Sequence, residues 1–575
     1  SVVVSDAQSF RSMAAAAKNL PRRLARRLGI RRRHVDAVRS RFTLRGGAKA
    51  EPVPTALPNS RVLTVDERAI SGNLDFEEFP AASKVALFVN DLEINAIHLP
   101  TRDASSPFRF PVRGVWQFIG PEDAISVRVD EARLPMPDGT KTYHAESQPK
   151  ASFSELEQRI LSGEIINSQG IVAVPKYLDK DWQRTVTSLY GELSDALEDV
   201  AGYRPFLVYG SLLGAVREGR PLGHDYDLDT AYLSDHSGVD EVLEEAAQIA
   251  LALQARGLFV DMRASCLHVS GPDHSQRVDL YHFFFNEDGE LRLAWGAANP
   301  VPFQKEQWEG MEQIEFAGAD VFVPRHAEQL VSTFYGPDWR VPNPGFEWNA
   351  ERKTRASEAL FPKQLRADVN WQDYWRRKSF DTPTRFARFV GGLGIARQQV
   401  VDLGCGDARD VPLFVRSGAR VLGLDYASEA IESARGRRLA SDRAEFSLCD
   451  LQEAGALEAA VKEFKEPGAR HTLYYARQML DSIPDEAIEL LLAQLARLTV
   501  PGDHVAFEFR DVADNTLTGH ELRDCGRRVV DPDMVREWFD SNGIETLVDE
   551  GSSRWERRGS RQVRLHRLIG MRPQA

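Results

Sequence analysis

Short apolar runs separated by turn residues fill the chain between residues 61 and 146. The runs, rich in Val, Ile and Phe, cover residues 61–65, 84–89, 93–97, 114–119 and 124–129. Such runs with frequent turns predict a small antiparallel β-sandwich, which we assign to residues 51–150. The region shows no catalytic grouping, so we interpret it as a glycan-positioning module, an oligomerisation module or a structural spacer.

Helical and strand patterns are mixed between residues 151 and 350. Residues 151–203 are mostly helical, with an amphipathic stretch at 182–201, and a further helix is expected at 239–257. Apolar runs predict buried strands at 206–209, 258–262, 267–269 and 277–285, and another strand carries residues 227–229. We assign this mixture to one domain over residues 151–350.

A third pattern begins after a charged junction at residues 351–363. An apolar strand at 399–403 runs into a glycine turn, and the next strand, at 420–424, ends in Asp425. Further strands are expected at 473–479 and 505–511. Alternating strands and helices predict a Rossmann-like domain over residues 371–575. The whole chain is therefore expected to be multidomain, of α/β and α+β class.

Charge is unevenly distributed along the 575 residues, whose formal net charge is -13. Residues 1–50 hold 13 Lys or Arg against only Asp6 and Asp36, a local +11, so the rest carries -24. Leu20, Leu24 and Leu28 recur at helical spacing among the arginines. This basic amphipathic arm is predicted to bind an anionic membrane surface, with a flexible tail or a helix packed on the acidic body as alternatives.

Compartment and partners follow from the same composition. No apolar run reaches the roughly 18 residues that span a bilayer, and the Arg-rich start lacks a signal-peptide pattern. Four scattered cysteines form neither a CxxC pair nor a disulfide framework. We expect a cytoplasmic, reduced protein without structural zinc, peripheral at the inner membrane face if the arm binds there. The acidic body argues against nucleic acid as a partner.

Asp227 and Asp229 are the first candidates for chemistry. Side chains alternate along a strand, so the two carboxylates point to the same face while Leu228 is buried behind them. Two adjacent carboxylates repel unless a cation lies between them, and Mg2+ or Mn2+ prefers such oxygen ligands. Asp279, the isolated acid of the strand at 277–285, would complete this metal and catalytic site. Gly210 and Ser211 would form a turn whose backbone N–H groups approach a phosphate.

The same region resembles the LicD family, which includes the fukutin-related proteins. The resemblance rests on Gly210-Ser-Leu-Leu-Gly-Ala-Val-Arg217, Gly223-His-Asp-Tyr-Asp-Leu-Asp229, Glu328-Gln-Leu and Tyr335-Gly-Pro-Asp-Trp-Arg-Val-Pro342. It implies a nucleotidyltransferase-like fold that transfers a phosphate-linked group from a cytidine diphosphate donor to a glycan, with Arg217 at the substrate phosphate. His224 and Tyr226 replace a Trp and an Asp of the usual motif, so the donor is in question.

The third domain resembles the class I S-adenosylmethionine-dependent methyltransferases. The resemblance rests on Asp402-Leu-Gly-Cys-Gly406, on Asp425 at the tip of the next strand, and on Cys449-Asp450 after a third strand. The glycines let a nucleoside approach the backbone, and the acid accepts ribose hydroxyl hydrogen bonds. The predicted cofactor-binding residues are Asp402, Gly404, Gly406, Asp425 and Asp450. The alternative is a degenerate, non-catalytic copy.

Arginines near the carboxyl ends of later strands suggest an anionic methyl acceptor. Arg477 and Arg510 are predicted as catalytic residues there, because guanidinium groups bind phosphate bidentately. Glu508 and Asp511 lie beside them in the sequence, and His520 and Arg523 are further candidates.

Together these patterns predict a bifunctional enzyme of surface-polysaccharide modification. A nucleotide donor and a glycan acceptor would meet at the first site. Two alternatives remain open: an RNA-modifying nucleotidyltransferase-methyltransferase, or a non-catalytic, membrane-associated scaffold of polysaccharide synthesis.

Overall fold

A computed structural model describes most of the chain after residue 57. The described residues are 58–99, 105–146, 148–271, 276–342, 346, 348–354, 359–396, 398–437, 442–465, 471–517, 525–558 and 561–574. The predicted basic arm at residues 1–50 lies outside them, as do His520 and Arg523. None of the helices within these ranges combines the length and the apolar character needed to cross a membrane.

Two antiparallel sheets form the first module. One sheet has the order β1-β2-β5 and the other β4-β3-β6-β7, and their buried faces contribute to one hydrophobic core. In β3 this core takes Val85, Leu87 and Val89, the alternate positions of the strand. The strands are β1 (Arg61–Val65), β2 (Ala69–Asp75), β3 (Lys84–Val89), β4 (Leu92–His98), β5 (Ser105–Pro111), β6 (Ile125–Val129) and β7 (Ala132–Arg133).

The predicted strand at 114–119 is wrong, because Trp116–Phe118 forms a 3-10 helix, η2. Gly114 lies so close to the backbone of Ile171 that an added Cβ would be 3.1 Å from its Cα, which leaves no room for a neighbouring strand. Three strands of this module were not predicted: β2, β5 and the two-residue β7. β2 contains Gly72, where an added Cβ would lie 2.3 Å from the Arg61 carbonyl oxygen of the paired strand. β5 contains two prolines and is an edge strand, where proline is tolerated.

Three short elements extend the same core. They are α4 (Phe153–Leu161), β8 (Ile165–Ile166) and β9 (Val172–Ala173). Ser152 caps α4 by accepting a hydrogen bond from the Glu155 amide at 3.2 Å. Leu156, Ile166 and Val172 pack into the core of the two sheets. The elements that follow residue 150 therefore begin with a part of this module.

A mixed sheet forms the centre of the second domain, with the order β12-β13-β14-β11-β10-β17-β16 and β15 paired to β14. β11 is parallel to β14 and antiparallel to β10. The strands are β10 (Phe206–Leu207), β11 (Leu228–Leu233), β12 (Phe259–Met262), β13 (Cys266–Ser270), β14 (Arg277–Phe285), β15 (Leu291–Arg292), β16 (Met311–Phe316) and β17 (Ala319–Pro324). The helices include α5 (Lys180–Ala201), α6 (Tyr209–Leu213), α7 (Val239–Ala255), α8 (Ala327–Tyr335) and α9 (Ala350–Thr354), with a π turn, η3 (Gly214–Glu218), and a 3-10 helix, η4 (Lys305–Gln307).

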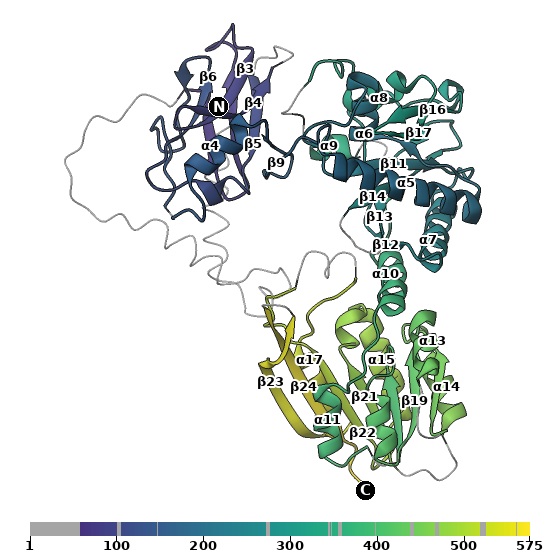
Figure 1. Cartoon of the computed structure of the whole chain (residues 1–575). Coiled ribbons are helices and arrows are strands. Elements are labelled where there is room, and N and C mark those ends of the chain that lie inside the picture. The colour runs from purple at the N-terminus through teal and green to yellow at the C-terminus, as the bar shows by residue number, and fades with distance from the viewer. Residues whose placement is uncertain are drawn as a thin grey trace, which may run out of the picture. The chain divides into compact units, whose positions relative to one another are not determined.

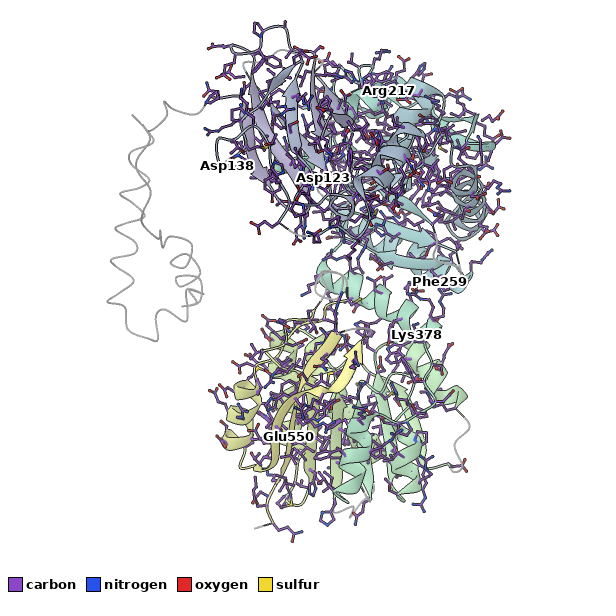
Figure 2. The ribbon with its side chains drawn as sticks, turned by 60° about the vertical axis from the view of Figure 1, so that its left-hand side comes forward. Asp123, Asp138, Arg217, Phe259, Lys378 and Glu550 are labelled. Atoms are coloured by element: carbon purple, nitrogen blue, oxygen red, sulfur yellow. The ribbon has the colours of Figure 1, made fainter. Side chains whose placement is uncertain are left out.

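One helix, α10 (Lys363–Arg377), runs through the boundary predicted at residue 371. Its Asn370 side chain accepts a hydrogen bond from the Met262 amide at 2.7 Å and donates one to the Met262 carbonyl at 3.0 Å. Figure 2 labels Phe259, the first residue of β12, and Lys378, the residue after α10. The side chain of Asn370 therefore satisfies backbone groups at the end of the edge strand β12.

The third domain has a seven-stranded sheet of order β20-β19-β18-β21-β22-β24-β23 (Figure 1). The first five strands are parallel, and β24 runs antiparallel to β22. The strands are β18 (Gln399–Leu403), β19 (Arg420–Asp425), β20 (Ala444–Leu448), β21 (Thr472–Arg477), β22 (His504–Arg510), β23 (Glu545–Arg558) and β24 (Arg561–Met571). This is the Rossmann-like fold predicted from the strand pattern.

Helices cover both faces of this sheet. Val400 and Val401, neighbours in β18, belong to two different hydrophobic cores, as expected for a strand buried on both sides. One core includes residues of α14 (Ala456–Phe464), α15 (Asp485–Leu498) and α17 (Pro532–Ser541), and the other includes residues of α11 (Arg385–Gly392), α12 (Val411–Arg416) and α13 (Ser428–Gly436). A 3-10 helix, η5 (Leu480–Ser482), follows β21.

Candidate functional site

Three acids meet at the centre of the second domain's sheet. Asp229 in β11 lies directly opposite Asp279 in β14, because the two strands pair in parallel with these residues in register. Asp227 immediately precedes β11, and Leu228 between the two acids is buried. Asp227 and Asp279 expose only 7% and 4% of their surfaces. The predicted acids thus line one cavity.

Gly210 and Ser211 lie in the first turn of α6, whereas the sequence predicted a turn between strands. The Gly210 amide donates a hydrogen bond to Asp229 Oδ2 at 3.2 Å, and Ser211 Oγ accepts one from the Asp229 amide at 2.9 Å. Tyr209, with a left-handed φ of 43°, starts this helix, and its ring centroid lies 4.4 Å from that of Phe334. The two small residues therefore fix the position of Asp229.

Arg277 is the residue of this site that the sequence analysis missed. Its Nη2 donates to Asp227 Oδ2 at 2.6 Å, and its Nε donates to Asp279 Oδ1 at 2.9 Å. The guanidinium carbon lies 5.1 Å from the ring centroid of Tyr226, whose hydroxyl oxygen is 3.1 Å from Nη2. The signal was present, because Arg277 is two residues before Asp279 and strand alternation puts both side chains on one face.

The acids raise one another's pKa. Burial, together with the charge of Asp227, raises the pKa of Asp225 and that of Asp279 to about 8. Burial and the three other carboxylates hold the pKa of Asp229 well above its usual value. Burial also raises the pKa of Asp227, although Arg277 opposes this shift. A site of this kind holds protons at neutral pH until a cation replaces them.

The segment between α6 and β11 contains the remaining predicted residues. Arg217 pairs with Glu218 at 2.8 Å and donates to the Trp339 carbonyl at 3.3 Å, so its charge is already balanced in part. His224 and Tyr226 are exposed and line the same cavity as the acids. The carboxyl of Asp225 lies against Gly210, where an added Cβ would be 2.8 Å from Oδ2.

Cys266 and His268 extend the acidic group along β13. Their ligand atoms and a carboxylate oxygen of Asp279 all lie within 4.8 Å of one another. His268 is opposite Asp279 in the antiparallel register. Two arginines already contact this group. Arg277 forms an ion pair with Asp279, and Arg263 Nε donates a hydrogen bond to His268 Nδ1 at 3.3 Å. The sequence signal for this grouping was the alternation of side chains along β13, which places Cys266 and His268 on the same face of the strand.

The predicted cofactor residues of the third domain surround one cavity of about 980 Å3. Asp402, Gly404, Asp425 and Asp450 line it, each at or just beyond the carboxyl end of a parallel strand. Burial and the nearby carboxylates of Asp410 and Asp425 hold the pKa of Asp402 well above its usual value. Aromatic side chains also line the cavity, among them Trp371, Trp375 and Tyr426.

Gly406 and Asp425 support each other beside this cavity. Asp425 Oδ2 accepts a hydrogen bond from the Gly406 amide at 2.9 Å, and Oδ1 accepts one from the Ala427 amide at 3.0 Å. Burial raises the pKa of Asp425 to about 6, although these amides oppose the shift. Gly406 has a φ of 55°, and an added Cβ would lie 2.3 Å from the ring of Trp375. Only glycine fits there.

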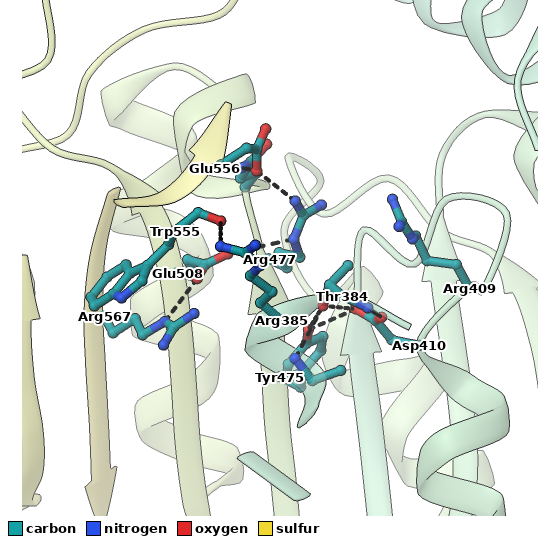
Figure 3. A network of polar contacts seen from close by, with 12 residues as sticks. Thr384, Arg385, Arg409, Asp410, Tyr475, Arg477, Glu508, Trp555, Glu556 and Arg567 are labelled. Atoms are coloured by element: carbon teal, nitrogen blue, oxygen red, sulfur yellow. Dashed lines mark hydrogen bonds and ion pairs between the residues drawn. The ribbon is translucent and has the colours of Figure 1, made fainter. Parts of the chain in front are cut away.

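The two arginines predicted at the acceptor end are not equivalent. Arg477 lines the cavity, but it pairs with Glu556 at 2.8 Å and with Glu508 at 3.4 Å (Figure 3). Arg510 is 1% exposed, pairs with Asp514 at 3.5 Å and does not line the cavity. The structure thus corrects the predicted position of Arg510 at the acceptor mouth, because the side chain is buried in an ion pair.

Comparison with known proteins supports the two predicted kinds of domain. Residues 202–326 match the nucleotidyltransferase domain described as LicD/FKTN/FKRP, and residues 400–502 match a methyltransferase domain. A ubiquinone biosynthesis O-methyltransferase of Serratia proteamaculans is 31% identical over 119 residues, which are 20% of this chain and 43% of that protein. The homologous enzyme of Yersinia pestis is 30% identical over 118 residues, again 20% of this chain and 43% of its length. The chain thus spans less than half of these relatives.

The similarity of the chain to solved structures is low, both in TM-score and in sequence identity. A SAM-dependent methyltransferase of Anabaena variabilis has a TM-score of 0.28 and 16% identity, covering 35% of this chain and 93% of its own. The glycopeptide N-methyltransferase MtfA complexed with sinefungin has a TM-score of 0.26 and 15% identity, covering 34% and 90%. By the family matches, the chain contains a LicD nucleotidyltransferase domain at residues 202–326 and a methyltransferase domain at residues 400–502.

Proposed function

We propose that the chain is a bifunctional enzyme of surface-polysaccharide modification. The LicD domain would transfer a phosphate-linked group from a nucleotide diphosphate donor of cytidine type to a glycan, with the help of Mg2+ or Mn2+. The methyltransferase domain would then transfer a methyl group from S-adenosylmethionine to the product. The basic arm at residues 1–50 would bring the enzyme to an anionic membrane surface.

The observation that carries the first half of this proposal is the register of Asp229 and Asp279. Two carboxylates on neighbouring strands, with Asp227 beside them, form a set of hard oxygen donors in a cavity. Their raised pKa values fit a divalent cation, because it would stabilise the charged forms that burial and mutual repulsion disfavour.

Asp227, Asp229 and Asp279 would hold the cation, which when bound neutralises charge on the diphosphate leaving group. Asp225 is the best candidate for the base that accepts the glycan hydroxyl proton. It lines the same cavity as the three acids that would hold the cation. Its carboxyl group makes no hydrogen bond to another described residue, so it is available to an acceptor hydroxyl.

The second half of the proposal rests on the cavity of the methyltransferase domain. Asp425, at the tip of β19, would accept hydrogen bonds from ribose hydroxyls, and Gly404 would let the nucleoside approach the backbone. Asp402 and Asp450 also line the cavity, and its aromatic side chains offer stacking surfaces. S-adenosylmethionine, when bound, supplies an activated methyl group.

The methyl group would go to the phosphate that the LicD domain installs, which requires that the transferred group is a bare phosphate, with the nucleoside monophosphate as the leaving group. Transfer to a phosphate monoester forms an oxygen–carbon bond as the sulfur–carbon bond breaks and S-adenosylhomocysteine leaves. A dianion and a sulfonium cation become a monoanionic diester and a neutral thioether, so no proton has to be removed. The diester has no free end, and it would cap the glycan. Fusion of the two domains raises the effective concentration of the shared intermediate.

The experiment that tests this proposal separates the two activities. Asp227→Asn should abolish transfer from a cytidine diphosphate donor, because a neutral amide cannot balance the cation, and should leave S-adenosylhomocysteine binding unchanged. Asp235→Asn changes an exposed acid after the end of β11 and is the matched control. Mass spectrometry of the glycan would follow both steps. Full transfer by Asp227→Asn would reject the metal site, and methylation of unphosphorylated glycan at the same rate would reject the cap.

A further inference from the structure

Several arginines line the methyltransferase cavity, and two of them are held in place by backbone carbonyls and not by carboxylates. Arg477 and Arg567 line the cavity, and both pair with Glu508, at 3.4 and 2.8 Å. Arg385 and Arg409 line the same cavity. Within the part of the chain that the structure describes, neither Arg385 nor Arg409 forms an ion pair with a carboxylate, and their hydrogen bonds go to backbone carbonyls.

The side chain of Arg409 is held in place without being neutralised (Figure 3). Its Nε donates to the Thr382 carbonyl at 3.0 Å, and its guanidinium carbon lies 4.4 Å from the ring centroid of Phe380. These contacts fix the guanidinium plane. Its two terminal nitrogens make no hydrogen bond to any described residue, so up to four N–H donors remain for a ligand.

The acids nearest to Arg409 in sequence are committed to other partners. Asp410 accepts hydrogen bonds from the Thr384 amide at 2.6 Å, from the Thr384 hydroxyl at 2.8 Å and from the Tyr475 hydroxyl at 2.8 Å. Asp407 pairs with Arg437 at 2.5 Å and accepts the Phe380 amide at 2.6 Å. Within the described residues, neither carboxylate forms an ion pair or a hydrogen bond with the guanidinium of Arg409.

Arg385 reaches the cavity from the start of α11. Its Nη1 donates to the carbonyls of Arg554 and Trp555, each at 3.2 Å, which ties the guanidinium to β23. Nε and Nη2 make no hydrogen bond to a described residue. Figure 3 shows Arg385 between Trp555 and the group formed by Thr384, Asp410 and Tyr475. Its remaining donors are therefore available to a ligand in the same cavity.

We propose that Arg385 and Arg409 bind the anionic group of the methyl acceptor, and that this group is a phosphate monoester. Uncompensated guanidinium groups with fixed planes and open N–H pairs suit the tetrahedral oxygens of phosphate. The inference deepens the proposed function and rests on it for the identity of the acceptor. It replaces Arg477 and Arg510, whose charges are matched by carboxylates, as the source of anion specificity.

Calorimetric titration of the full chain tests the site. The ligands are inorganic phosphate, glucose 6-phosphate and glucose, each with and without saturating S-adenosylhomocysteine. The variants are Arg385→Gln, Arg409→Gln and the double variant, with Arg416→Gln, an exposed arginine of α12 outside the cavity, as matched control. The LicD site is the same in all of them, so differences between variants isolate the methyltransferase cavity.

We expect each single variant to bind glucose 6-phosphate about tenfold more weakly, the scale of one charge-assisted hydrogen bond. The double variant should lose more, and Arg416→Gln should match the wild type. S-adenosylhomocysteine affinity should stay constant in all variants, which also shows that they fold. Equal phosphate affinity in the double variant and the wild type would overturn the site. So would a wild-type affinity for glucose equal to that for glucose 6-phosphate. Failure of S-adenosylhomocysteine to bind the wild type would instead reject the proposed methyltransferase function. The two failures are distinguishable, because phosphate binding is also measured in the absence of S-adenosylhomocysteine.

Discussion

The Nη2 of Arg277 lies 2.6 Å from Oδ2 of Asp227. Its Nε also lies 2.9 Å from Asp279, so a cation of the chain itself bridges two of the three acids proposed to hold a metal ion. Binding of a divalent cation between these acids must compete with the guanidinium. Arg277 would then be released toward the cavity, where its charge can interact with the donor diphosphate.

Arg277→Gln should change both stability and metal binding. Without metal, loss of the guanidinium leaves two buried carboxylates without a counter-charge, and we expect a loss of roughly 1–3 kcal/mol in the free energy of unfolding. Mn2+ should bind more tightly to the variant, because no arginine has to be displaced. Thermal unfolding over a Mn2+ titration measures both effects. Arg292→Gln breaks the 2.6 Å pair with Glu290 in the same domain and is the control. Unchanged Mn2+ affinity in Arg277→Gln would show that the arginine and the metal do not share a site.

The raised pKa values of Asp225 and Asp279 make stability depend on pH and metal. Both pKa values are about 8 in the folded protein, above the ordinary aspartate value of 3.8. Between these values the folded state binds more protons than the unfolded chain, so stability present at acid pH is lost as pH rises through about 8. The Tm in EDTA should fall from pH 6 to pH 9. The rise in Tm caused by Mn2+ should be larger at pH 8.5 than at pH 6.5, and equal rises at both would contradict the assignment.

Alanine substitutions at Gly406 and Gly418 form a matched pair that tests the close contact beside the cofactor cavity. Both have positive φ, 55° and 93°, so alanine costs backbone strain of roughly 1 kcal/mol at either position. An added Cβ at Gly418 meets nothing within 4 Å, whereas at Gly406 it meets the ring of Trp375. Gly406→Ala should therefore lower Tm further and weaken S-adenosylhomocysteine binding, and Gly418→Ala should affect Tm alone. A combined Gly406→Ala, Trp375→Ala variant should recover part of the Tm. Equal Tm for the two glycine variants would argue against the contact.

Asp425→Asn tests the predicted ribose contact. Loss of a charged acceptor should weaken S-adenosylhomocysteine binding by about 1.5–3 kcal/mol. The amide oxygen can still accept one backbone N–H, so the fold around Gly406 should survive. Calorimetric titration measures the affinity, and Glu432→Gln, an exposed acid of α13, is the control. Wild-type affinity in Asp425→Asn would remove this residue from the cofactor site.

Buried strands with one isolated acid were well predicted from the sequence. The strand expected at 277–285 is β14 with the same bounds, and the strand at 399–403 is β18. Long apolar runs ending at glycine or aspartate identify such strands because both faces must be buried. The position of Asp425 at the end of β19 follows from the same pattern.

Pairing between side chains distant in sequence was not predictable. Glu556 neutralises Arg477 from 79 residues away, and no local pattern announces that contact. The turn expected at Gly210 is instead part of the helix α6. The Gly210 amide donates a hydrogen bond to Asp229, 19 residues further along the chain, and the local sequence does not predict that contact. The edge strand β5 was missed because its prolines argue against a strand unless the edge position is known.

The two hydrogen bonds between α6 and Asp229 also bear on engineering. Ser211 supplies a hydroxyl to the Asp229 amide, and a side chain at position 210 would meet the Asp225 carboxyl, so substitutions at either position would disturb the acids before they changed the substrate range. Libraries that aim at a new donor should instead begin at the exposed position 224, whose side chain lines the cavity. Tyr226 also lines it, but its ring and hydroxyl contact Arg277.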